Sequence, residues 1–105
     1  MDIRGYGANR PYATPESLEE LTGPVSGRIT LPGHLDSGPR RTYDLDEPSD
    51  VRLLYMRVIR ESSTVDDLRR LLNVRLLRRV WAALVLPPRV RRMWESRFSD
   101  LHRAA

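Results

Sequence analysis

Residues Asn73 to Leu101, with the sequence NVRLLRRVWAALVLPPRVRRMWESRFSDL, hold both tryptophans and the single phenylalanine of the chain. In the second half of this stretch, apolar residues recur at three- and four-residue steps, the spacing that lines one face of an α-helix. Proline lacks an amide donor and disfavours the α conformation in the residue before it, so Pro87 and Pro88 must divide the stretch. It therefore predicts two helices, from about Val74 to Val85 and from Pro88 to about His102.

Two more helices are expected upstream. Proline and acidic residues in Glu47-Pro48-Ser49-Asp50 are typical of a helix start, and that helix should run to Ser62. A second helix is predicted from about Val65 to Leu72, begun by a capping box in which Ser63 or Thr64 faces an acidic residue three positions on. Asn73 either leaves this helix in the left-handed conformation or caps the next one.

The N-terminal half is less regular. Thr14-Pro15-Glu16-Ser17 predicts a short helix capped by Thr14 and ended by Gly23-Pro24. The alternation from Ser26 to Leu31 favours an extended, strand-like connector, anchored by Tyr43 and Leu45. Because the sequence contains no second convincing strand, we do not expect a sheet.

These elements predict an all-α fold: a small helical bundle of about four helices, preceded by a short helix and an extended connector. Residues 1–13 have the composition of a disordered tail, 14–46 hold the short helix and connector, and 47–105 form the helical domain. A helical region of about 55 residues is small for a self-sufficient core. Its surplus of large apolar residues therefore predicts a protein partner or a homodimer.

Charge is divided unevenly along the chain, whose net charge is +4. Residues 1–50 carry five arginines and nine acidic residues, whereas residues 51–105 carry thirteen arginines and five acidic residues. The basic half is the helical half, which permits contact with nucleic acid or with an acidic protein surface. All eighteen cations are arginine, however, and the bias of a GC-rich genome explains that excess equally well.

Several classes of function are disfavoured. The chain has no cysteine, which excludes disulfides, thiolate metal sites and cysteine nucleophiles. His34, expected in a turn, and His102 lack the spacing of a zinc site, and there is no nucleophile elbow or phosphate-binding glycine loop. With no apolar run of the ~20 residues that a membrane span needs and no signal peptide, we expect a cytoplasmic protein without membrane contact. We therefore expect no enzyme, cofactor or metal.

The candidate partner-binding residues are the arginines of the last two helices and one tryptophan. They are Arg75, Arg78, Arg79, Arg91, Arg92 and Trp94. Arginine pairs bidentately with carboxylates, and a tryptophan flanked by arginine is typical of an interface hot spot. Trp81 and Trp94 fit equally as core residues.

An alternative function is a helix-turn-helix-like DNA-binding transcriptional regulator. Two short helices joined near Asn73, with arginines on the second, match that arrangement superficially. The turn lacks the usual glycine, and the chain has no glutamine, a residue that often reads bases together with arginine. Sequence-specific readout is therefore weakly supported.

Short segments from Val25 to Leu101 also resemble a family of small proteins from GC-rich bacteria. They include Leu31-Pro32-Gly33-His34-Leu35-Asp36, Tyr43-Asp44-Leu45, Leu54-Tyr55, Asp67-Leu68-Arg69, Leu72-Asn73, Leu86-Pro87, Val90-Arg91 and Trp94-Glu95. Such proteins accompany AbiEii-like or MenT-like nucleotidyltransferase toxins. The resemblance implies the antitoxin of a toxin–antitoxin system, an interaction protein whose basic helices and segment His34 to Asp46 would cover an acidic, metal-binding cleft and block nucleotide entry.

Overall fold

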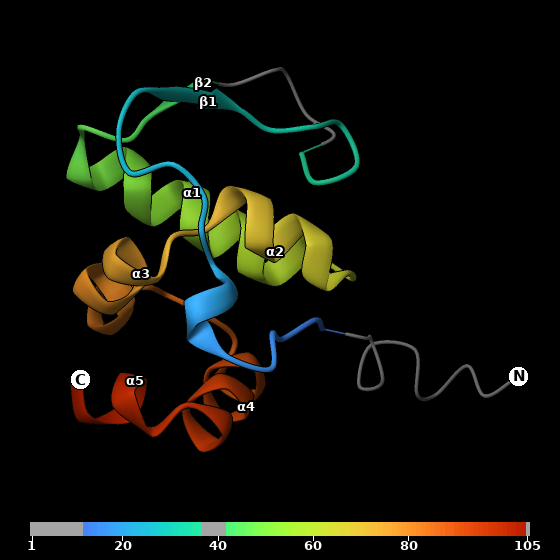
Figure 1. Ribbon diagram of the computed structural model, residues 1–105, viewed down its shortest axis with the longest axis vertical. Coiled ribbons are helices and arrows are strands. Elements are labelled where there is room, and N and C mark those ends of the chain that lie inside the picture. The colour runs from blue at the N-terminus through green and yellow to red at the C-terminus, as the bar shows by residue number, and fades with distance from the viewer. Residues whose placement is uncertain (1–11, 37–41, 105) are drawn as a thin grey trace, which may run out of the picture.

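The structure, a computed structural model, describes residues 12–36 and 42–104, with backbone only for residues 102–104. The predicted disordered tail over residues 1–13 lies almost wholly outside the described residues. Helices dominate the described chain, and one small sheet accompanies them (Figure 1). In chain order the elements are η2 (Leu18–Glu20), β1 (Arg28–Thr30), β2 (Thr42–Asp44), α1 (Pro48–Glu61), α2 (Val65–Leu71), α3 (Val74–Val80), η3 (Trp81–Ala83), α4 (Pro88–Arg97) and α5 (Ser99–Ala104).

The prediction of an unpaired connector is wrong. Strands β1 and β2 pair antiparallel, with Ile29 opposite Tyr43, and the hydroxyls of Thr30 and Thr42 lie 2.9 Å apart. Three residues are too few to show the alternation by which a strand is recognised in sequence, so β2 was missed. The fold is therefore mainly α with a two-stranded sheet. Tyr43 is buried as predicted and, with Leu45, fastens the hairpin to α1.

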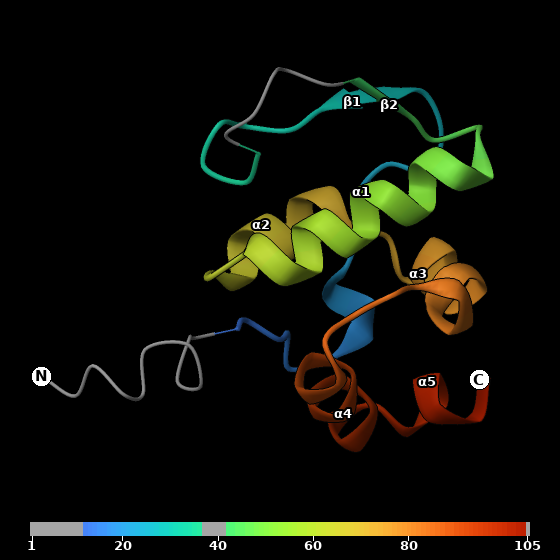
Figure 2. The same cartoon turned by 180° about the vertical axis from the view of Figure 1, so that it is seen from behind.

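Helix α1 confirms its prediction. Glu47 precedes it, Pro48 is its first residue, and it ends at Glu61. Figure 2 shows α1 on the near side of the molecule, with the β-hairpin above it and the segment from η3 to α4 below it. Its inner face is buried, whereas Leu53 on the outer face is 41% exposed.

The short N-terminal helix is a single 3-10 turn, and its predicted cap at Thr14 is wrong. Ser17 caps it instead: the Ser17 hydroxyl accepts from the Glu19 amide at 3.2 Å, and the Glu20 carboxylate accepts from the Ser17 amide at 2.9 Å. This reciprocal pair is a capping box three residues later than expected.

The junctions around α2 follow one of the two predicted alternatives. Asn73 caps α3, because its side-chain oxygen accepts from the Arg75 amide at 2.9 Å, and its amide nitrogen donates to the Gly23 carbonyl at 3.0 Å. The capping box predicted for α2 is not formed. The Thr64 hydroxyl donates instead to the Asp67 carboxylate at 3.4 Å.

The last two predicted helices are each too long. Helix α3 ends at Val80, and after η3 the chain is extended, so that Val85 is 78% exposed. The second helix is divided at Phe98, whose backbone is extended, and α5 begins at Ser99. Five α-helices rather than about four therefore occupy the described residues.

One core joins all of these elements. Ala13, Leu18, Leu31 and Leu35 from the N-terminal part belong to the same buried cluster as the helices. The large apolar residues from whose surplus we predicted a partner or homodimer are thus mostly used within the chain itself. Among the described helices, none combines the length and the apolar character needed to cross a membrane.

Candidate protein-binding surface

The structure does not bring the six predicted contact residues together. Arg75 and Arg79 meet at one surface hollow, while Arg92 is exposed on α4. Arg78 and Arg91 are bonded within the chain, and Trp94 is buried. Only part of the predicted set can therefore form one binding surface.

The hollow consists of two adjoining depressions of about 240 and 200 Å³. Both are lined by Val25, Leu76 and Arg79, and we call the whole the Val25 hollow. It lies between the connector that follows η2, the start of α1 and helix α3. Its lining residues are Val25, Leu45, Asp46, Pro48, Val51, Arg75, Leu76, Arg79 and Val80.

Apolar side chains form about half of the lining of the Val25 hollow, and the charged residues Asp46, Arg75 and Arg79 form part of the rest. Leu45, Val51 and Leu76 are buried members of the core, whereas Val25 itself is 48% exposed. Isolated exposed apolar residues are common on protein surfaces and need no explanation. Here the exposed valine stands beside a concave apolar surface, which is the form of a site that can receive a side chain.

Two arginines border this apolar surface. Arg75 and Arg79 are four residues apart on α3, so their side chains lie on the same side of the helix. Both are exposed, and within residues 12–36 and 42–104 neither guanidinium has a hydrogen bond or ion pair. Like charges at this spacing cost a few tenths of a kcal/mol, so the pair does not stabilise the helix.

Arg78 is satisfied within the chain. Its Nη2 atom lies 3.3 Å from the Glu19 carboxylate and 3.0 Å from the Asp100 carboxylate. These pairs connect α3 with η2 and α5, and the three side chains line a separate polar depression of about 250 Å³. Arg78 therefore joins elements of the fold, which leaves it less available to a partner than predicted.

Arg91 is a structural residue as well. Its guanidinium donates to the carbonyl groups of Trp81, at 3.1 Å, and Leu84, and to the Glu95 carboxylate at 3.2 Å. The predicted role of Arg91 as a partner contact is therefore not supported by its position, because its donors are used at the end of η3.

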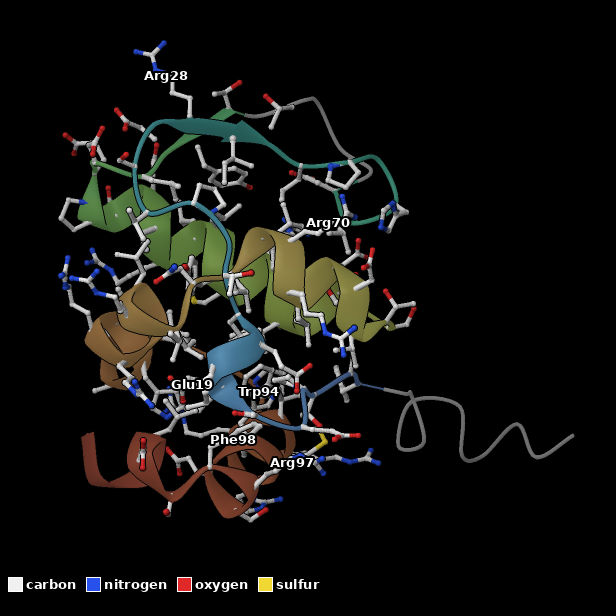
Figure 3. The ribbon with its side chains drawn as sticks, in the orientation of Figure 1. Glu19, Arg28, Arg70, Trp94, Arg97 and Phe98 are labelled. Carbon is white, nitrogen blue, oxygen red and sulfur yellow. The ribbon has the colours of Figure 1, made fainter. Side chains whose placement is uncertain are left out.

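The prediction of Trp94 as a contact residue is wrong, and the core alternative is correct. The Trp94 side chain is fully buried, with ring centroids 5.9 Å from Trp81 and 5.7 Å from Phe98. Figure 3 shows Trp94 and Phe98 inside the molecule at the level of η2. The neighbouring Arg97 donates to the Pro15 carbonyl at 3.0 Å.

His34 lies in a turn, as predicted, but its partner was missed. Its Nε2 atom is 2.8 Å from the carboxylate of Asp67, which Arg70 also approaches at 2.6 Å. Burial alone would raise the pKa of Asp67, yet the hydrogen bonds from His34 and Arg70 outweigh it and lower the pKa below its ordinary value. Thirty-three residues separate His34 from Asp67, so no local pattern could have indicated that the turn is tied to α2.

Comparison of this chain with protein-family models, with curated proteins and with solved structures finds no match. The resemblance to antitoxins of nucleotidyltransferase toxins is therefore untested by any relative and stays a prediction. The geometry of the Val25 hollow is the basis for proposing a function.

Proposed function

We propose that the chain is a non-enzymatic interaction protein that binds an acidic protein surface through the Val25 hollow. One observation carries the proposal: Arg75 and Arg79, both exposed and unpaired among the described residues, border a concave apolar surface with Val25 half exposed at its edge. An apolar centre with charged groups at its rim is the usual composition of a protein–protein interface.

Both halves of this arrangement favour an acidic protein as the partner. The planar guanidinium groups of Arg75 and Arg79 suit bidentate pairing with carboxylates, and two such pairs would fix the orientation of the partner. The apolar surface formed by Val25 and Leu76 would receive an aliphatic or aromatic side chain. A phosphate backbone would satisfy the arginines but would leave that apolar surface without a partner.

The resemblance noted in the sequence extends the proposal to a particular class of partner. In this form the chain is a cytoplasmic antitoxin, and its partner is a nucleotidyltransferase toxin. Arg75 and Arg79 would pair with carboxylates of the metal-binding cleft, and the bound chain would prevent nucleotide entry. The support for this step is the match in residue types over Val25 to Leu101 together with the unpaired charge of α3.

The alternative of a DNA-binding regulator has less support. Helix α3 has seven residues, and of its arginines Arg78 is already paired with Glu19 and Asp100. Two cations then remain on this helix for phosphate contacts, Arg75 and Arg79. If DNA is the ligand, affinity for the chain's own promoter should fall steeply with salt concentration, since each neutralised phosphate releases counterions.

The test is co-expression of the chain with the product of the gene that neighbours its own. We expect rescue of growth and co-purification of the two proteins, and an affinity at least about tenfold weaker for Arg75→Glu/Arg79→Glu. Arg28→Glu/Arg89→Glu is the matched control, because it makes the same change of charge at two exposed arginines outside the hollow.

Two results would contradict the proposal at different levels. Failure of the wild-type chain to rescue growth or to co-purify would exclude the antitoxin role. Equal weakening by the two double variants would show that binding depends on overall charge, and the Val25 hollow would then not be the binding surface.

A further inference from the structure

The outer face of α1 carries a second surface with unsatisfied chemistry. Leu53, Met56, Arg57 and Arg60 are spaced at three- and four-residue steps, so they share one face of the helix. This face points away from the core, and Figure 2 shows it between the β-hairpin and the segment that joins η3 to α4. It is distinct from the Val25 hollow, which involves the first turns of α1 on its other side.

An apolar patch lies on this face. Leu53 is 41% exposed, and it lines a hollow of about 130 Å³ together with Tyr43, Met56, Arg57 and Arg60. Val85 extends the patch from the neighbouring segment, because its amide donates to the Met56 sulfur at 3.1 Å while its side chain is 78% exposed. We call Leu53, Met56, Arg57, Arg60 and Val85 the α1 outer patch.

The charge of the patch has one sign. From Val51 to Arg60 the helix carries three arginines and no acidic residue. Arg57 and Arg60 are exposed, and within the described part of the chain neither has a hydrogen bond or an ion pair. No acidic side chain lines the hollow beside them. The local potential is therefore positive around a hollow whose apolar lining comes from Leu53 and Met56.

We propose that the α1 outer patch is a docking surface for a short acidic segment of a protein partner. One apolar side chain of that segment enters the hollow beside Leu53, and its carboxylates pair with Arg57 and Arg60. Met56 suits such a surface, since its flexible thioether adapts to the shape of an incoming side chain. A nucleic acid would neutralise the arginines but would leave Leu53 and Val85 in water, so a protein segment fits better.

The spacing of the two arginines indicates the form of the segment. Arg57 and Arg60 are three residues apart on α1, which separates their backbone positions by about 4.5 Å along the helix axis. Carboxylates one helical turn apart on a partner helix have nearly the same separation. The segment should therefore be an amphipathic helix with two acidic residues three or four positions apart and an apolar residue one further helical turn along the same face.

The inference goes beyond the proposed function and does not depend on it, since the two surfaces share no lining residue. The test is selection from a displayed library of random peptides against the full-length chain. We expect the recovered peptides to carry the acidic and apolar spacing described above. Their affinity, measured by fluorescence anisotropy with synthetic peptides, should fall about tenfold or more in Arg57→Glu/Arg60→Glu and in Val85→Asp.

Arg28→Glu/Arg89→Glu is the matched control and should leave the affinity within about twofold, since these two exposed arginines lie outside both the α1 outer patch and the Val25 hollow. The altered side chains are exposed, so the variants should fold, which circular dichroism would verify. The inference is overturned by recovery of no peptides, by peptides without acidic residues, or by equal weakening with both arginine pairs. The inference is also overturned if a random DNA duplex binds more tightly than the peptides and if that binding depends on Arg57 and Arg60.

Discussion

Arg91 lies over Trp81, with its guanidinium carbon 4.9 Å from the centroid of the indole ring. The same guanidinium donates to the carbonyl groups of Trp81 and Leu84, and Glu95 accepts from both Arg91, at 3.2 Å, and the Trp81 indole, at 2.9 Å. The Trp81 carbonyl also accepts from the Leu84 amide at 3.1 Å, and Arg91 adds donors to it and to the Leu84 carbonyl where η3 ends. One side chain thus fixes where the chain leaves α3 and how α4 returns against it.

Arg91→Ala should lower the free energy of unfolding by about 1–3 kcal/mol, because it removes the donor to the Leu84 carbonyl and one of the donors to the Trp81 carbonyl and to the Glu95 carboxylate. Arg91→Lys should recover little of the lost free energy of unfolding, since an ammonium group cannot bond to two carbonyls and a carboxylate as the planar guanidinium does. Urea unfolding measures both. The control is the exposed neighbour Arg92→Ala, expected within about 0.5 kcal/mol of wild type. Equal losses for the two alanine variants would contradict the role given to Arg91.

Gly23→Ala should destabilise the fold, because a Cβ atom there would lie 2.7 Å from the Arg70 carbonyl oxygen and 2.9 Å from that of Leu72. Both obstacles are backbone atoms, so the strand-like contact between Gly23 and the end of α2 would have to open. A loss of about 1–3 kcal/mol is expected in urea or thermal unfolding. Gly33→Ala meets no atom within 4 Å and should be neutral, and a comparable loss there would contradict this explanation.

Helix α1 was predictable because proline, acidic residues and a regular apolar spacing all agree over Pro48–Glu61. The ends of α3 and α4 were not, because they depend on contacts between distant residues. Arg91 ends η3 from the following helix, and Phe98 leaves the helical conformation while it packs on Trp94. Strand β2 exists through its pairing with β1 and shows no pattern of its own.

Only part of the candidate site could be predicted, because the sequence shows residue type and spacing but not contacts between distant residues. Composition and helical spacing were enough to single out Arg75 and Arg79, which border the Val25 hollow. They could not show that Arg78 is paired with Glu19 and Asp100 across fifty-nine and twenty-two residues of chain. Nothing in the sequence indicated that Val25 is exposed, because its exposure depends on where the connector passes over α3. Tertiary partners, rather than residue type, decide which arginines stay available.

Asp67→Asn should weaken the protein most at neutral pH. Hydrogen bonds from His34 and Arg70 hold the pKa of Asp67 below its ordinary value despite burial. The ionised carboxylate therefore contributes to stability above the unfolded-state pKa of Asp67, and this contribution is lost as pH falls through the folded-state pKa. We expect a cost of about 1–3 kcal/mol at pH 7 and a shallower loss of stability under acid than in wild type. The exposed Asp66→Asn is the control for urea unfolding from neutral to acid pH, and an identical pH profile for the two variants would contradict the assignment.

Tyr55→Phe should remove a link between α1 and the start of α3 and, with it, part of the alkaline sensitivity of the fold. The buried Tyr55 hydroxyl accepts from the Asn73 amide at 2.9 Å, and burial raises the pKa of Tyr55 to about 12. Between about pH 10 and 12, the folded state therefore keeps the phenolic proton while the unfolded chain releases it. Because the unfolded state binds fewer protons there, wild-type stability falls by up to about 1.4 kcal/mol per pH unit. The phenylalanine variant has no phenol to ionise and therefore lacks this loss of stability. In denaturant titrations it should be about 1–2 kcal/mol less stable than wild type at pH 8, and the difference should shrink as pH rises. A stability difference that stays constant to pH 12 would mean that Tyr55 ionises as readily in the folded protein as in the unfolded chain, and the buried hydroxyl link would then be refuted.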